Sequence, residues 1–209
     1  MSKTTVMYLV RHGATAQNEA TPVVLQGSGV NGPLNENGQR QARQVADCLS
    51  RLPLAAVYCS PMLRARQTAE AIAAPHSLDV VDVADLHEVD VGSWEGNSWS
   101  RIMEEDPDYY RAFMDNPADT PYRDGESYRQ VLHRVLPEFD RLLDEQAGRS
   151  FAVVAHNVVN RVYAAHLMGL ELRLARELRQ ENCCVNVIRR KSDRTELVTL
   201  NAALHLSVD

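Results

Sequence analysis

The 209-residue sequence has no excess of basic residues, no apolar run long enough to cross a membrane, and no cysteines at metal-ligand spacing. It contains 22 basic and 28 acidic side chains, which give a formal net charge of −6. We therefore expect neither a nucleic-acid partner nor a polybasic surface that binds membranes. The apolar stretch near the N-terminus is shorter than the core of a secretory signal, so we expect a cytoplasmic protein.

The four cysteines are typical of buried thiols rather than of a metal site or a disulfide. Cys59, Cys183 and Cys184 lie in or beside predicted strands, and we expect no bound metal. The chain also lacks an internal repeat, a low-complexity tract and a linker. A length near the upper end of the single-domain range then predicts one domain over residues 1–209.

The sequence does contain an alternation of apolar runs and helical patterns. The apolar runs are typical of strands, and they lie at residues 6–10, 55–60, 78–86, 151–155, 185–190 and 196–200. The earlier runs are typical of buried parallel strands, and the last two are expected to be joined by a turn. Helical spacing appears between them, at residues 35–52, 61–74, 127–146 and 158–168, with Asn35 as a candidate N-cap. This order predicts an α/β fold with three layers, in which helices flank a mostly parallel central sheet.

Residues from about 97 to 126 interrupt the alternation with short helical pieces, prolines and a cluster of aromatic residues. We expect this segment to form an insertion, or lid, over the carboxyl ends of the strands. Its acidic residues favour a ligand whose remaining part is not strongly anionic: Glu104, Glu105, Asp106 and Asp108.

Polar side chains end or follow the predicted parallel strands: His12, Ser60, Glu88 and His156. Because parallel strands bring their carboxyl ends to one edge, where ligands of open α/β sheets bind, these residues are expected to meet. Arg11 precedes the first histidine. Arg64 lies in the first turn of the helix after Ser60, and a helix N-terminus already favours anions.

Each of these residues also has a structural explanation. His12 and His156 would be hydrogen-bonded histidines at strand ends, and Glu88 would be one more carboxylate in an acidic stretch. Arg64 would be a solvated charge on a helix. Since these explanations require separate coincidences at one edge of one sheet, a shared site is favoured.

The segments that carry these residues form an ordered series over almost the whole chain. The series comprises Arg11-His12-Gly13 with Thr15 and Asn18, Gln26-Gly27, Ser60 to Ala65, Leu86-His87-Glu88, Trp94-Glu95-Gly96, Gly125-Glu126-Ser127 and Val154-Ala155-His156. It resembles the histidine phosphatase superfamily, also called the phosphoglycerate mutase-like family. The resemblance implies metal-independent hydrolysis of phosphomonoesters through a phosphohistidine, with no cofactor, on a small phosphate ester.

The resemblance assigns a role to each catalytic candidate. His12 is expected to attack phosphorus, and Glu88 to protonate the leaving oxygen and then activate water. Arg11, Arg64 and His156 are expected to hold the phosphate oxygens, with His156 cationic when phosphate is bound. Four further residues are expected to bind substrate: Asn18, Gln26, Gly27 and Asn157.

Two positions depart from the family pattern, Ala14 after the Arg-His-Gly triplet and Asn157 after the second histidine. The family often has Glu or Gln at the first position and usually has Gly at the second. Asn157 either caps the following helix or contacts the substrate, and the sequence favours neither alternative over the other. Our hypothesis is that Asn157 narrows substrate choice without abolishing the chemistry.

The segment after Glu88 separates three possible activities. Residues 89–96 are similar to the phosphatase branch of the family. The mutases of the family share a pair of adjacent arginines in this region, and the lid of this chain has no such pair. A phosphatase is therefore the first expectation, a cofactor-dependent phosphoglycerate mutase the second, and a non-catalytic phospho-ligand binding module the third. The sequence leaves the physiological substrate open, and it also leaves a homodimer open.

Overall fold

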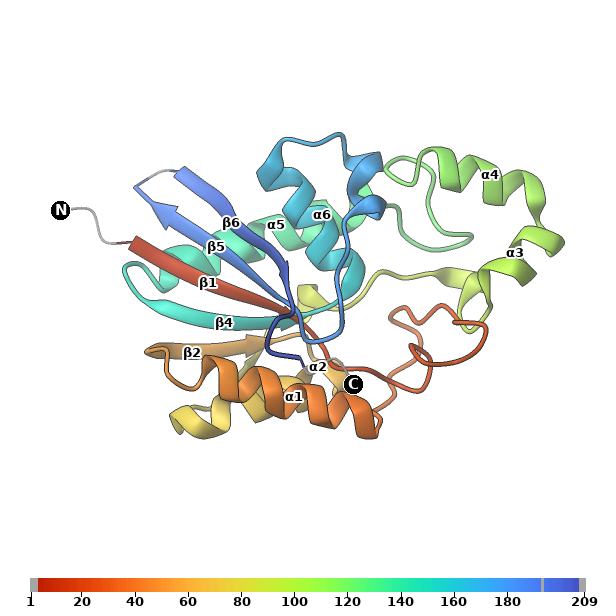
Figure 1. The fold of residues 1–209 in the computed structure, drawn as a ribbon. Coiled ribbons are helices and arrows are strands. Elements are labelled where there is room, and N and C mark those ends of the chain that lie inside the picture. The colour runs from red at the N-terminus through yellow and green to blue at the C-terminus, as the bar shows by residue number, and fades with distance from the viewer. Residues whose placement is uncertain (1–3, 193, 207–209) are drawn as a thin grey trace.

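The computed structural model describes residues 4–192 and 194–206, and its centre is a six-stranded sheet with the order β3-β2-β4-β1-β5-β6 (Figure 1). The strands are β1 (Thr4–Arg11), β2 (Leu54–Cys59), β3 (Val80–Asp82), β4 (Ser150–Ala155), β5 (Val185–Lys191) and β6 (Arg194–Ala202). The first four strands pair in parallel, whereas β5 and β6 are antiparallel to their neighbours. The predicted mostly parallel α/β sheet is confirmed.

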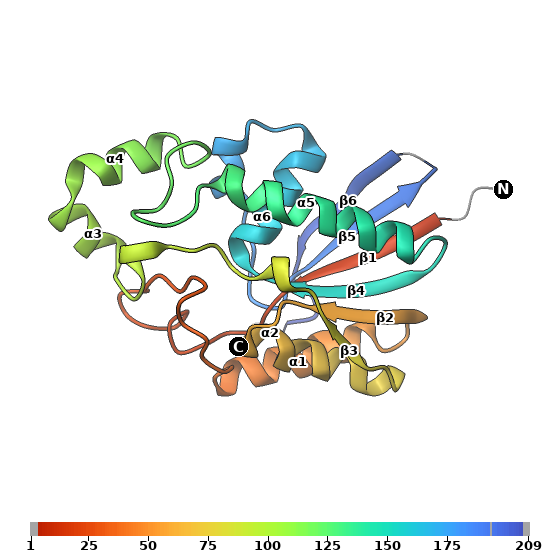
Figure 2. The ribbon, with the colours of Figure 1, turned by 180° about the vertical axis from the view of Figure 1, so that it is seen from behind.

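Helices cover both faces of this sheet. Figures 1 and 2 show α1 (Glu36–Leu49) and α2 (Leu63–Ala73) on one face and α5 (Tyr128–Glu145) and α6 (Asn157–Met168) on the other. The alternating side chains of β4 explain this arrangement. Phe151, Val153 and Ala155 join the apolar cluster under α5 and α6, while Ala152 and Val154 join the cluster under α1 and α2. A strand buried on both faces must be apolar throughout, which is the pattern seen in the sequence.

Local signals set several helix boundaries. The side chain of Asn35 caps α1 by accepting a hydrogen bond from the backbone N–H of Gly38 at 2.8 Å, as predicted. Helix α5 begins with a reciprocal capping box between Ser127 and Gln130. Helix α2 begins at Leu63, slightly later than predicted, and α6 begins at Asn157, one residue earlier than predicted.

The third extended stretch is shorter than the sequence indicated. Of the predicted residues 78–86, only Val80–Asp82 form β3, and Ala84–Leu86 form a 3-10 helix. Within the described residues this strand lies at the edge of the sheet and pairs with β2 alone, over three residues. An edge strand receives ladder hydrogen bonds from one side alone, so the extended conformation ends where that pairing ends.

The pairing register brings three strand ends to one place. Arg11 lies opposite Ala155, and the backbone N–H of His12 donates to the Ala155 carbonyl at 3.0 Å. On the other side of β4, the backbone N–H of Ser60 donates to the carbonyl of Val154, also at 3.0 Å. The residues that follow β1, β2 and β4 are therefore neighbours by construction of the sheet.

The segment from about 97 to 126 contains α3 (Trp99–Glu105) and α4 (Pro107–Asp115), which extend beyond the carboxyl ends of the strands (Figures 1 and 2). Trp94 is buried and holds the segment through edge-to-face contacts with the rings of Trp99, Tyr109, Phe113 and Tyr122. In the part of the chain that the structure describes, no helix is both long enough and apolar enough to cross a bilayer.

Candidate active site

The His12 ring is buried at the end of β1 and is fixed by its own backbone. Its Nδ1 lies 2.7 Å from the carbonyl oxygen of Gly13. A carbonyl oxygen only accepts hydrogen bonds, so in the neutral ring Nδ1 carries the proton and Nε2 keeps its lone pair. Burial lowers the pKa of His12 well below its usual 6.5, and the charges of Arg64 and Arg11 lower it further. The ring is therefore a neutral base with one nitrogen available for attack.

His156 stands beside His12 at the end of β4, and the two ring centroids are 5.1 Å apart. Nε2 of His156 lies 2.7 Å from Oγ of Ser60, while its buried Nδ1 has no partner within the described chain. Burial, followed by the charge of Arg64, lowers the pKa of His156 well below 6.5. In the unliganded protein this histidine is neutral, so the cationic form expected with bound phosphate needs the anion to raise its pKa.

Arg11 and Arg64 supply the fixed positive charge of the site. Arg64 is fully buried, and its Nη1 and Nη2 donate to the carbonyls of Val30 at 2.8 Å and Gly27 at 3.1 Å. Burial lowers the pKa of Arg64 to about 10, so its guanidinium stays charged near pH 7. Arg11 donates to the backbone carbonyl of Gln180 at 2.5 Å. The Nε atoms of both arginines are buried without a partner among the described residues, and an anion can accept from them.

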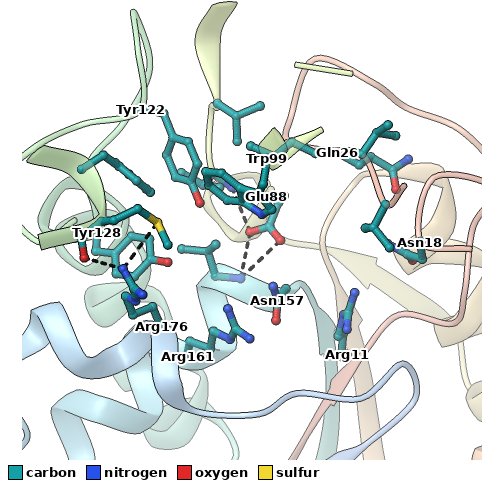
Figure 3. Close-up of a pocket in the computed structure, with 18 of the residues that line it drawn as sticks. Arg11, Asn18, Gln26, Glu88, Trp99, Tyr122, Tyr128, Asn157, Arg161 and Arg176 are labelled. Carbon is teal, nitrogen blue, oxygen red and sulfur yellow. Dashed lines mark hydrogen bonds between the residues drawn. The ribbon is translucent and has the colours of Figure 1, made fainter. Parts of the chain in front are cut away.

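Glu88 is buried, 4% exposed, where the chain passes the N-terminus of α6. Its carboxylate accepts hydrogen bonds from the backbone N–H of Val158 at 3.2 and 3.3 Å, and its Oε1 accepts another from Val89 at 3.0 Å. Figure 3 marks hydrogen bonds of the Glu88 carboxylate with dashed lines. These backbone donors fix the orientation of the Glu88 carboxyl group, which lines the pocket beside the N-terminus of α6.

Two amide side chains on the loop after β1 present donors to the same pocket. The Oδ1 atom of Asn18 accepts from the backbone N–H of Thr15 and from Nδ2 of Asn182, both at 3.2 Å. The Oε1 atom of Gln26 accepts from the Thr15 hydroxyl at 2.8 Å, and its buried Nε2 has no partner among the described atoms. Because the oxygen of each amide is occupied by the protein, the amide nitrogens are left to donate to a ligand.

Gly27 takes a different position from the one its expected binding role requires. Its backbone N–H donates to Oε1 of Glu95 at 2.8 Å, and its carbonyl accepts from Arg64. An added Cβ would stand 2.6 Å from the carbonyl oxygen of Val89. Gly27 is thus closely packed between two chain segments and supports the loop that carries Gln26, without lining the pocket itself.

The N-cap of α6 is His156, and Asn157 is the first residue of the helix. The proposal that Asn157 caps this helix is therefore wrong, because an N-cap must precede the first helical residue. Instead, the Asn157 side chain lines the pocket, and its Oδ1 is buried without a partner in the described chain. Figure 3 shows this side chain between Arg161 and Arg11.

The pocket has a volume of about 350 Å³ and brings most of the predicted residues together. Its wall includes Arg11, His12, Asn18, Gln26, Glu88 and Asn157, while Arg64 and His156 are fully buried behind it. The lid contributes the aromatic part of the wall through Trp99, Phe113 and Tyr122. Among the described residues no group of three or more His, Cys, Asp or Glu side chains is placed to hold a metal ion.

The acidic residues of the lid do not line this pocket, contrary to the role that the sequence suggested for them. Glu105 pairs with Arg101, Asp106 with Arg123 and Asp108 with Arg111 at the surface. The pocket instead contains two arginines that no sequence argument placed there, Arg161 and Arg176. The spacing of four residues between Asn157 and Arg161 was a usable signal, because such residues share one helix face. No local signal identified Arg176.

These features define an α/β protein in which a neutral, oriented histidine and two arginines lie where the parallel strands β1 and β4 end. The sequence matches the histidine phosphatase superfamily (branch 1) over residues 7–203. It is 30% identical to phosphoserine phosphatase 1 of Hydrogenobacter thermophilus over 200 aligned residues. The alignment covers 96% of this chain and 93% of that one.

Two further comparisons extend this likeness. The chain is 31% identical over 180 residues to a probable phosphoglycerate mutase, GpmB, of Cronobacter sakazakii, covering 86% of this chain and 82% of the other. Among solved structures, Bacillus stearothermophilus YhfR superposes with a TM-score of 0.89 at 26% identity, covering 97% of this chain and 100% of that one. The chain belongs to the histidine phosphatase superfamily, as the order of its motifs indicated.

Proposed function

We propose that this chain is a metal-independent phosphomonoester hydrolase that acts through a phosphohistidine on a small phosphorylated metabolite. The observation that carries the proposal is the state of His12. Its Nδ1 is engaged by the Gly13 carbonyl, its pKa is lowered well below 6.5 mainly by burial, and Nε2 is left as the nucleophile. The names of the relatives support the same reaction class.

In the first half-reaction, Nε2 of His12 forms a bond to phosphorus and the ester P–O bond breaks. Glu88 gives its proton to the departing oxygen, so the leaving group departs as an alcohol. Charge on the three transferring oxygens is balanced by Arg11 and Arg64 and by the free amide donors of Asn18 and Gln26. Fixed cations take the part that a metal ion plays in other phosphoryl-transfer enzymes.

In the second half-reaction, a water molecule attacks phosphorus and the N–P bond breaks. Glu88, now a carboxylate, accepts the proton of this water, and inorganic phosphate leaves with His12 returned to its neutral form. One carboxyl group can serve both steps because the ester oxygen leaves, and the water oxygen later attacks, on the same side of phosphorus, opposite His12. The backbone N–H groups of Val89 and Val158 hold it in that position throughout.

A phosphoglycerate mutase is the second candidate, because the Cronobacter relative carries that name. A mutase returns the phosphoryl group to a second hydroxyl instead of to water. It therefore needs a bisphosphorylated primer and releases no net phosphate. The segment after Glu88 and the lack of adjacent arginines in the lid favour hydrolysis.

The test is release of inorganic phosphate from an aryl phosphate between pH 5 and 8 in the presence of a chelator, for wild type and His12→Ala. We expect chelator-resistant release by wild type and its loss in the variant. Labelled phosphate should also be trapped on wild type after rapid denaturation in alkali, in which phosphohistidine is stable, and not on the variant. Tight ester binding without release or trapping would contradict the proposal and favour a binding module.

Several properties remain part of this proposal. We expect residues 1–209 to act as one domain, with residues of about 97–126 as its lid, in the cytoplasm. The expected partner is a small phosphate ester and not a nucleic acid, and a homodimer stays open. Gel filtration with light scattering would determine the number of chains in the particle.

A further inference from the structure

The pocket wall opposite the Arg11 side carries two arginines for which the proposed phosphoryl transfer has no use. Arg161 projects from α6, one turn after Asn157, and Arg176 projects from the 3-10 helix Leu172–Glu177 that packs against α6. In Figure 3 both lie on one side of Asn157, with Arg11 and Asn18 on the other. A ligand that spans the pocket would meet a group of arginines at each end.

Arg161 is partly buried, and its Nε is buried without a hydrogen-bond partner in the described chain. No carboxylate of the described residues forms an ion pair with it. Its charge nevertheless reaches both sides of the pocket. Burial lowers the pKa of Arg11, and Arg161 contributes to that shift; burial raises the pKa of Tyr128, and Arg161 opposes that shift. Leaving a partly buried charge without a counter-ion is costly, unless a bound anion offsets the cost.

Arg176 is oriented by the lid. Its Nη1 donates to the backbone carbonyl of Met114, at the C-terminal end of α4, and its Nε donates to the carboxylate of Glu177 at 2.8 Å. Glu177 also lines the pocket. Arg161, Arg176 and Glu177 therefore give this wall a net charge of about +1. That charge matches a carboxylate better than a phosphate monoester, which carries about −1.5 to −2 near pH 7.

We propose that Arg161 and Arg176 form a subsite for a carboxylate carried by the substrate, so that the preferred ester has a phosphate at one end and a carboxylate at the other. This inference rests on the proposed hydrolase function and narrows its substrate class. Planar guanidinium groups suit a carboxylate because they can donate two parallel hydrogen bonds to it. Tyr122 and Tyr128 also line this pocket.

The experiment compares two esters that differ only at the group in question, 3-phosphoglycerate and glycerol 3-phosphate, in which a hydroxymethyl group replaces the carboxylate. We expect wild type to prefer 3-phosphoglycerate in kcat/KM. In Arg161→Gln this preference should fall by about 10- to 100-fold, the size expected for a hydrogen bond between charged groups. The activity on glycerol 3-phosphate, which has no carboxylate to bind, should fall much less than the activity on 3-phosphoglycerate. Arg176→Gln should act in the same direction.

Arg173→Gln is the matched control, because Arg173 lies in the same 3-10 helix as Arg176, pairs with Glu171 at the surface and does not line this pocket. It should keep the wild-type preference. A wild-type enzyme without a preference for the carboxylate ester would overturn the inference. So would an Arg161→Gln variant in which both esters lose activity equally, because Arg161 would then serve the shared phosphate half or the fold.

Binding separates this inference from the proposed function. Calorimetry with His12→Ala measures both esters without turnover, whether or not the wild type hydrolyses them. A preference for 3-phosphoglycerate that disappears in the double variant His12→Ala/Arg161→Gln supports the carboxylate subsite even if phosphate release fails. Equal binding of the two esters to His12→Ala contradicts the subsite even if the aryl phosphate is hydrolysed.

Discussion

Nε2 of His156 lies 2.7 Å from Oγ of Ser60, and this buried hydrogen bond joins the residue after β4 to the residue after β2. The Ser60 hydroxyl also accepts from the backbone N–H of Met62 at 3.3 Å, at the start of α2. The serine thus fixes the orientation of the second histidine relative to the helix that carries Arg64. This position follows from the parallel pairing of β2 with β4.

Ser60→Ala is expected to lower kcat by about tenfold, which corresponds to about 1.4 kcal/mol of lost transition-state stabilisation. The free energy of unfolding should fall by about 1–3 kcal/mol, because Nε2 of His156 stays buried without its partner. Steady-state kinetics and denaturant unfolding measure the two effects. Ser50→Ala, at the C-terminal end of α1, is the control and should change neither. A Ser60→Ala enzyme with wild-type kcat would show that His156 needs no such orientation.

The lowered pKa values of His12 and His156 predict how stability depends on pH. Below about pH 6.5 the unfolded chain binds protons on these histidines that the folded chain does not. Unfolding therefore becomes more favourable as pH falls through this window, and stability is highest above it. Thermal unfolding between pH 5 and 8 should show a midpoint that declines below pH 6.5. His12→Gln should reduce the steepness of this decline, and an unchanged slope would contradict the assignment.

The same protonation state predicts the acid side of the activity profile. Because the pKa of His12 lies well below 6.5 in the free protein, Nε2 keeps its lone pair at pH 6.5 and somewhat below. We expect kcat/KM for an aryl phosphate not to fall with the protonation of an ordinary histidine, and to decline only at lower pH. A decline centred at 6.5 would indicate that His12 is exposed to water or is not the nucleophile.

Two glycines of the loop after β1 provide a matched pair. A Cβ on Gly27 would lie 2.6 Å from the carbonyl oxygen of Val89 and 2.8 Å from Cγ2 of Val91, whereas a Cβ on Gly32 would meet no atom closer than 3.8 Å. Gly27→Ala is expected to destabilise the protein by about 1–3 kcal/mol and to raise KM, because the loop that carries Gln26 must shift. Gly32→Ala should be close to wild type in both measurements. Equal behaviour of the two variants would contradict the packing argument.

Asn157→Gly restores the residue that usually follows the second histidine in this family. If the Asn157 side chain narrows substrate choice, the variant should raise kcat/KM for poor substrates relative to good ones, and should keep the reaction. The measurement is a panel of phosphate esters of different size and charge. Asn157→Ala separates loss of the amide from the added backbone freedom of glycine. Unchanged specificity constants for every ester in both variants would contradict the hypothesis.

Local pattern predicted the elements that contribute to the catalytic edge. The apolar run of β4 indicated a strand buried on both faces, and this alone placed His156 at a carboxyl edge beside His12. The N-cap at Asn35 could likewise be predicted from a short side chain that accepts from Gly38. Such features depend on residues close in sequence, or on the rule that parallel strands end together.

The partners of individual polar atoms could not be predicted in this way. The sequence suggested a binding role for Gly27. Its N–H instead donates to the carboxylate of Glu95, 68 residues away, and its carbonyl accepts from Arg64. The sequence also left Asn157 balanced between capping and contact, and the helix boundary at His156 decided for the pocket. Acidic residues of the lid suggested a ligand whose remaining part is not strongly anionic, yet Glu105 and Asp108 pair with Arg101 and Arg111 at the surface and do not line the pocket.

The sequence by itself determined the class of fold and the family, and it indicated the residues proposed for the phosphoryl chemistry, because motifs and strand ends are local properties. The tertiary structure decided which ring nitrogen of His12 carries the proton and that the amide nitrogens of Asn18 and Gln26 can donate to a ligand. It also decided that Arg161 and Arg176 share a wall of the pocket. These outcomes depend on hydrogen-bond geometry and burial between segments distant in the chain, and such contacts exist only after the sheet and the lid have packed together.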